Sequence, residues 1–168
     1  MVDCFRWART LSAVVALPLA VAGCSSEGAA STDSSSIAFS TCPTEKRALP
    51  YQPGMEVPSS AGLFTVKLVE SVPGPPVKGN VVWTIQVDDA TLATSPPLDD
   101  VTVTVTPWMP DHAHGTVPVN VSATGGGRYG LNPLYLYMRG YWEIRLGLSS
   151  GTAATATADE AMIPICIP

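Results

Sequence analysis

The densest group of potential metal ligands in the sequence lies between Met109 and His114. Both histidines of the chain fall in this stretch, which reads Met109-Pro110-Asp111-His112-Ala113-His114-Gly115. In an extended loop, residues two apart project to the same side, so the imidazoles of His112 and His114 can converge on one ion, with the Met109 thioether turned toward the same point. Imidazole with thioether suits copper, particularly Cu(I), whereas magnesium and calcium prefer oxygen ligands.

Met138 is a fourth candidate ligand. The chain is expected to leave one end of the fold at Pro107, descend through residues 117–122 and return through residues 129–137, which brings Met138 back to the end it left. The alternative is structural: the histidines hydrogen-bond to the backbone of a tight, proline-flanked connection, and Met138 fills the core beneath Trp142. The residues alone leave both interpretations open.

The elements that must position these side chains are β-strands. Outside the N-terminal apolar run, no window of about 11 residues shows the 3.6-residue recurrence of a helix, and turn residues recur every eight to twelve positions or so. Two-residue alternation predicts strands over residues 64–72, 81–87, 101–106, 117–122, 129–137, 141–148 and 153–165. About seven strands over residues 42–168 predict an all-β, immunoglobulin-like β-sandwich.

The N-terminus has the form of a lipoprotein signal peptide, covering residues 1–23. Arg6 and Arg9 precede an apolar run that is too short to span a membrane, and the run ends in Val21-Ala22-Gly23-Cys24. This quartet resembles the bacterial lipobox, in which the cysteine is acylated and becomes the first mature residue; an ordinary signal-peptidase site is the alternative. Residues 24–41 are rich in Ser and Ala and predict a flexible tether. We therefore expect a lipid on Cys24 to anchor the protein to a membrane without crossing it.

The net charge and composition limit the classes of molecule that this protein is expected to bind. The whole chain has 9 Lys+Arg and 14 Asp+Glu, and removal of residues 1–23 leaves 7 and 13, a net charge of −6. A chain this acidic has too few Lys and Arg side chains to displace counterions from the phosphates of a nucleic acid, so nucleic acid is excluded as a partner. No serine lies in a G-x-S-x-G turn, and we predict no enzymatic activity. The expected partners of this monomer are the membrane, a metal ion or an envelope protein. Ser25 carries no acidic retention signal, which favours the outer membrane, facing the periplasm, over the inner membrane.

The four cysteines sort by position. Cys4 lies in the predicted signal peptide and Cys24 is the predicted lipid site, which leaves Cys42 and Cys166 in the folded part. In an oxidising compartment they are expected to pair as a disulfide that closes a long loop. The alternative is that they join the histidines as metal ligands, although neither has a C-x-x-C spacing.

Three short pieces of the sequence resemble the YtkA-like domain family. They are Met109-Pro110-Asp111-His112-Ala113-His114-Gly115, Gly127-Arg128-Tyr129 and Met138-Arg139-Gly140-Tyr141-Trp142-Glu143-Ile144, within a resemblance that covers about residues 61 to 148. The family is similar to FixH-like exported domains associated with the assembly of copper-containing oxidases. The resemblance implies a sandwich fold and a role with copper or another heavy metal. Asp111 and Ala113 depart from the small or soft residues that often accompany the histidines in such loops.

Two hypotheses follow from the sequence. The first is a lipoprotein that binds copper through His112 and His114, with Met109 and Met138 as further ligands. The second is a non-metal interaction or structural module of the cell envelope. For the second hypothesis, the aromatic residues expected on the surface either pack on neighbouring side chains or form a protein-binding face: Tyr135, Tyr137 and Tyr141.

Overall fold

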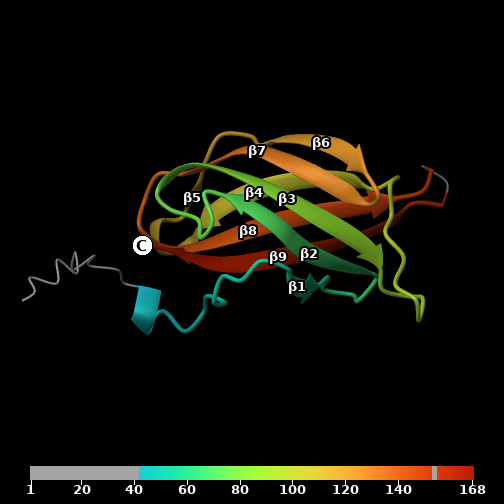
Figure 1. Ribbon diagram of the computed structural model, residues 1–168, viewed down its shortest axis with the longest axis horizontal. Coiled ribbons are helices and arrows are strands. Elements are labelled where there is room, and N and C mark those ends of the chain that lie inside the picture. Colours follow the sequence, from blue (N-terminus) through green and yellow to red (C-terminus); the bar gives the residue numbers. More distant parts are fainter. Residues whose placement is uncertain (1–41, 153–154) are drawn as a thin grey trace, which may run out of the picture. The chain divides into compact units, whose positions relative to one another are not determined.

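The strands of this protein alternate buried and exposed side chains. They form two antiparallel sheets (Figure 1). The structure is a computed structural model that describes residues 42–152 and 155–168. One sheet has the order β1-β2-β3-β7-β6 and the other the order β5-β4-β8-β9. The strands are β1 (Met55–Pro58), β2 (Phe64–Val72), β3 (Gly79–Asp89), β4 (Thr102–Met109), β5 (His114–Gly115), β6 (Asn120–Gly125), β7 (Arg128–Leu136), β8 (Gly140–Ser150) and β9 (Thr157–Ile167). In the described residues, two 3-10 helices accompany these strands: η1 (Cys42–Thr44) and η2 (Pro110–His112).

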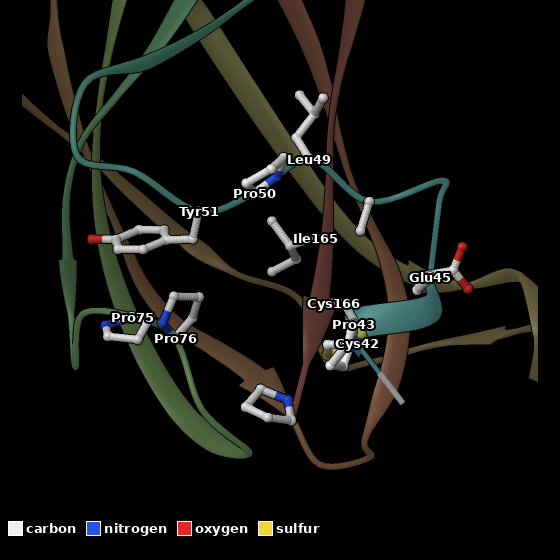
Figure 2. Close-up of a pocket in the computed structure, with 12 residues that line it drawn as sticks. Cys42, Pro43, Glu45, Leu49, Pro50, Tyr51, Pro75, Pro76, Ile165 and Cys166 are labelled. Carbon is white, nitrogen blue, oxygen red and sulfur yellow. A yellow bond between two sulfur atoms is a disulfide. The ribbon is translucent and has the colours of Figure 1, made fainter. Parts of the chain in front are cut away.

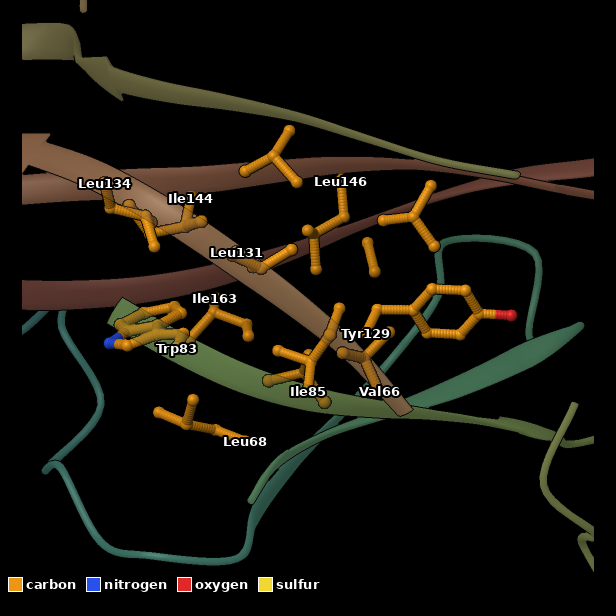
Figure 3. Packing of buried hydrophobic residues seen from close by; sticks show 14 of the residues in the cluster. Val66, Leu68, Trp83, Ile85, Tyr129, Leu131, Leu134, Ile144, Leu146 and Ile163 are labelled. Atoms are coloured by element: carbon orange, nitrogen blue, oxygen red, sulfur yellow. The ribbon is translucent and has the colours of Figure 1, made fainter. Parts of the chain in front are cut away.

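The core lies between the two sheets, where their inward-facing side chains meet (Figure 3). Trp83 of β3 and Trp142 of β8 are completely buried from opposite sheets. In β4 every second residue points inward, so the valines are buried and the threonines between them are exposed. Burying large apolar side chains of this kind contributes about 1.5–3 kcal/mol each. The predicted immunoglobulin-like, all-β sandwich is therefore confirmed.

The predicted strands correspond to seven of the nine observed, with differences at their ends. Residues 117–119 precede β6 instead of forming its start, because Pro118 has no N–H to donate to a neighbouring strand; Val117 is half exposed. The last strand, β9, begins at Thr157 rather than at residue 153. The two additional strands are short: β1 has four residues and β5 only two. Alternation cannot be read from so few positions.

The register of β4 against β8 fixes which connections lie at the same end of the sandwich. Trp108 pairs with Glu143 across the two strands, and these residues stand at the end of β4 and near the start of β8. The connection after β4 and the connection before β8 are therefore neighbours. This arrangement brings residues 109–115 and residues 137–139 to one end of the fold.

Several predictions concern residues outside the described part of the chain. The signal peptide (1–23), the lipid site Cys24 and the linker 24–41 all lie there, so they stay predictions. In residues 42–152 and 155–168, the structure has no helix with the length and apolar character needed to cross a membrane.

Candidate functional site

The segment from Met109 to Gly115, here called the histidine loop, is a tight reversal of the chain. β4 ends at Met109, η2 follows, and Ala113 adopts a left-handed conformation (φ 53°, ψ 37°) in which its N–H donates to the Pro110 carbonyl oxygen at 3.2 Å. His114 then pairs back with Met109 as β5. A non-glycine residue with positive φ is uncommon, so the two-residue strand and the hydrogen bond must hold the turn. The reversal places one histidine on each side of Ala113.

The two imidazoles of the loop lie close to each other at the protein surface. Their ring centroids are 5.8 Å apart and the rings are inclined by 53°. Two imidazoles bound to one ion have centroids roughly 5–6 Å apart, given metal–nitrogen bonds of about 2.0 Å. Nδ1 of His114 lies 3.2 Å from the Gly115 carbonyl oxygen. In the tautomer with the proton on Nδ1, that nitrogen donates to the carbonyl and Nε2 keeps its lone pair for an ion.

Met138 and His114 line the same hollow, which has a volume of about 520 Å³. One wall comes from the chain after β4 and the other from the connection between β7 and β8. The Trp142 indole N–H donates to the Met138 carbonyl oxygen at 3.0 Å, which fixes the backbone that carries the thioether. The complete lining, here called the His114 hollow, is His114, Gly115, Thr116, Val117, Tyr137, Met138 and Trp142.

Met109 takes a different position from the other candidate ligands. Its side chain is 1% exposed and belongs to the core. Its terminal methyl group packs under the turn at Gly140, where an added Cβ would lie only 3.1 Å away. The structure therefore exposes His112 and His114, packs the partly buried Met138 against the core beside His114, and buries Met109 within the core.

Within the described residues, no three side chains of His, Cys, Asp or Glu gather closely enough to hold a metal ion. The donors at the histidine loop are two neighbouring imidazoles, and Met138 lines the same hollow as His114. That donor set matches the preference of Cu(I) for soft ligands.

The sequence model of the YtkA-like family matches residues 61–147, which is just over half of the chain. This chain belongs to the YtkA-like family. The matched region contains the whole histidine loop and Met138. Searches of curated proteins and of solved structures gave no significant match.

A cluster of charges outside the matched YtkA-like region contacts the histidine loop. Arg47 donates to both carboxylate oxygens of Asp111, at 2.8 and 2.7 Å, and also binds Glu45. Its guanidinium lies 4.2 Å from the centroid of the Tyr141 ring. Hydrogen bonds from Arg47 lower the pKa of both carboxyl groups, and those of Asp111 and Glu45 raise the pKa of Arg47. This contact could not be predicted from the sequence, because Arg47 and Asp111 are 64 residues apart.

Cys42 and Cys166 form a disulfide bond that joins η1 to β9 (Figure 2). The bond forms part of the wall of an apolar hollow of about 530 Å³, which is lined also by Tyr51, Pro75 and Pro76. With both sulfur atoms in the disulfide, neither thiol is free to join the histidines, so the alternative of cysteine metal ligands does not fit this structure.

The expected surface tyrosines divide into two kinds. Tyr137 is 54% exposed, and its ring stacks on Tyr135 with centroids 5.3 Å apart. Tyr141 is buried beside Arg47, so the expectation that it lies on the surface was wrong. Burial raises the pKa of its hydroxyl. The reason is a local break in alternation, since both Tyr141 and its neighbour Trp142 are buried at the start of β8.

Proposed function

We propose that this protein is a lipid-anchored protein of the cell envelope whose YtkA-like domain binds a soft metal ion, Cu(I) above others. His112 and His114 supply the nitrogen ligands and Met138 the sulfur ligand. The observation that carries the proposal is the pair of neighbouring imidazoles, whose ring centroids are 5.8 Å apart, with His114 lining the same hollow as Met138. Met109 is buried in the core against Gly140 and is not placed as a surface ligand.

The ligand types favour Cu(I) over zinc. A thioether is a neutral, polarizable donor, and Zn²⁺ sites are built from thiolate, imidazole and carboxylate instead. The carboxylate of Asp111, which precedes His112 in η2, is already bound on both oxygens by Arg47. The site is therefore suited to an ion that binds without a charged oxygen ligand.

The exposed position of the histidines suits a carrier or a sensor rather than an enzyme. Both imidazoles lie at the surface, where an ion can be passed to or taken from another molecule. An anchor on Cys24 would hold this surface near a membrane, with the outer membrane favoured over the inner one. Two acyl chains or more make such an anchor stable, at about 0.8 kcal/mol for each buried methylene.

A second candidate function is supported by the rim of the same hollow. Val117 is 50% exposed and Tyr137 is 54% exposed, and exposed apolar side chains that lie together often mark a protein-binding surface. In that case the domain would hold an envelope protein and the histidines would only shape the loop.

Titration with Cu(I) under a competing chelator separates the two functions. The chain purified from the cell envelope in mild detergent is compared with the His112→Ala/His114→Ala double variant and with Met138→Leu. We expect one Cu(I) per chain, loss of binding in the double variant and weaker binding in Met138→Leu. Met162→Leu is the matched control, because Met162 is an exposed methionine on β9. Equal affinity in the wild type and the double variant would exclude the metal site.

The anchor is tested separately by mass spectrometry of the N-terminal peptide. A mature chain that begins at Cys24 and carries the mass of attached acyl chains would support the lipoprotein proposal. An unmodified Cys24 in protein recovered from the membrane fraction would contradict it.

A further inference from the structure

The N-terminal segment, residues 42–51, lies outside the region that matches the YtkA-like family, yet it reaches the histidine loop. Its course is fixed at two points on β9. The Cys42–Cys166 disulfide holds one point, and the Leu49 N–H donates to the Pro164 carbonyl oxygen at 2.9 Å at the other. Arg47 lies between these two attachments in the sequence, so its backbone is held near β9, a strand of the sheet that carries the loop.

The guanidinium of Arg47 is engaged on three sides. Two parallel hydrogen bonds join it to Asp111, two more join it to Glu45, and the ring of Tyr141 lies against it. A guanidinium that binds carboxylates in this forked manner fixes their orientation as well as their distance. Tyr141 itself pairs with Cys166 across β8 and β9, so the platform beneath the guanidinium adjoins the disulfide.

Asp111 is the middle residue of η2, between Pro110 and His112. Fixing both carboxylate oxygens of Asp111 therefore fixes the turn that presents the His112 imidazole. The ion pair is half exposed on both sides, at 48% and 49%. Exposed ion pairs contribute little to global stability. The Arg47–Asp111 pair therefore affects the position of the loop rather than the stability of the domain.

We propose that Arg47 is a positioning residue for the histidine loop, and that the Cys42–Cys166 disulfide keeps Arg47 in place. This inference rests on the proposed metal site, because it concerns the affinity of that site. It means that a segment outside the family's domain sets the geometry of the ligands. Preorganised ligands bind more tightly because less ordering remains to be done when the ion arrives.

A double-mutant cycle tests this role by Cu(I) titration of the purified full-length mature chain. We expect Arg47→Ala and Asp111→Ala each to weaken Cu(I) binding about three- to tenfold, less than the 10–100-fold typical when a direct partner of a ligand is lost. The double variant should be no weaker than the weaker single variant, because both changes remove the same contact. Arg47→Lys, which keeps the charge but not the fork, should recover only part of the affinity.

The cycle also excludes a simple charge effect. If Arg47 acted only as a nearby positive charge, Arg47→Ala would bind Cu(I) more tightly and Asp111→Ala more weakly. Lys67→Ala is the control for a lost surface ion pair, since Lys67 bonds Glu56 at 2.7 Å on the other sheet. It should bind Cu(I) as the wild type does. The Cys42→Ser/Cys166→Ser variant, compared at a temperature at which it is still folded, should show a loss of Cu(I) affinity similar to that of Arg47→Ala.

Amide hydrogen exchange measured without metal separates failure of this inference from failure of the metal site. The Ala113 N–H, which donates to Pro110, should exchange faster in Arg47→Ala than in wild type or Lys67→Ala. Unchanged Ala113 exchange together with unchanged Cu(I) affinity would overturn the role of Arg47 while leaving the metal site in place. Faster exchange in a chain that binds no Cu(I) would overturn the proposed function, and with it any role of Arg47 in metal affinity.

Discussion

Removing the Cys42–Cys166 disulfide should produce the largest loss of stability of any change outside the core. The bond joins residues 124 positions apart, so it closes almost the whole described chain into one loop. The loop-entropy relation gives about 16.5 cal/mol/K for that length, or about 4.9 kcal/mol at 25 °C. A domain of this size has a total stability of about 5–15 kcal/mol, so the variant should be near the limit of folding.

Urea unfolding followed by tryptophan fluorescence measures this loss. Trp83 and Trp142 are completely buried, so their emission should change when the core opens. With an m-value of about 1.5 kcal/mol/M, the Cys42→Ser/Cys166→Ser variant should unfold at a urea concentration about 3 M lower than the wild type. Reduction of the wild type should cause a shift of the same size. A midpoint within about 0.5 M of the wild-type value would refute the loop-closure reasoning.

Two further predictions concern the stability of the sandwich. Gly127→Ala should destabilise more than Gly126→Ala by about 1–3 kcal/mol: both glycines have positive φ, but a Cβ on Gly127 would lie 2.9 Å from the Leu98 backbone nitrogen, whereas one on Gly126 meets nothing within 4 Å. Equal urea midpoints would contradict the steric argument. Tyr129→Phe should cost about 1–3 kcal/mol, because the buried hydroxyl accepts from the Val101 N–H at 3.0 Å and donates to the Leu98 carbonyl at 2.8 Å. Burial raises the pKa of the Tyr129 hydroxyl, so the stability that this hydroxyl contributes is present below about pH 10 and is lost as the pH rises further. The stability of Tyr129→Phe should therefore fall less steeply between about pH 9 and 11 than that of the wild type. Parallel plots of stability against pH for the two proteins would contradict this.

The main strands could be predicted from the sequence because alternation is a local signal. In residues 101–105 every second side chain is a valine that belongs to the core, and the structure buries each of them. The return of Met138 to the end that carries the histidines also followed from counting strands, since hairpin connections alternate between the two ends of a sandwich. These inferences need only neighbouring residues and simple topology.

The details of the candidate site could not be read in this way. The left-handed turn at Ala113 depends on a hydrogen bond and a two-residue strand, and no sequence pattern predicts either of them. The burial of Met109 depends on the space beneath Gly140, which belongs to another strand. Arg47 reaches Asp111 from a segment 64 residues earlier, and no spacing rule connects the two. Long-range contacts of this kind require the folded structure.

X-ray absorption at the copper edge tests the central claim most directly, because it reports the atoms bound to the ion. In the Cu(I)-loaded chain we predict imidazole nitrogen from His112 and His114 together with a sulfur ligand, and loss of the sulfur signal in Met138→Leu but not in Met162→Leu. A copper site with oxygen ligands only, or a sulfur signal unchanged in Met138→Leu, would contradict the account.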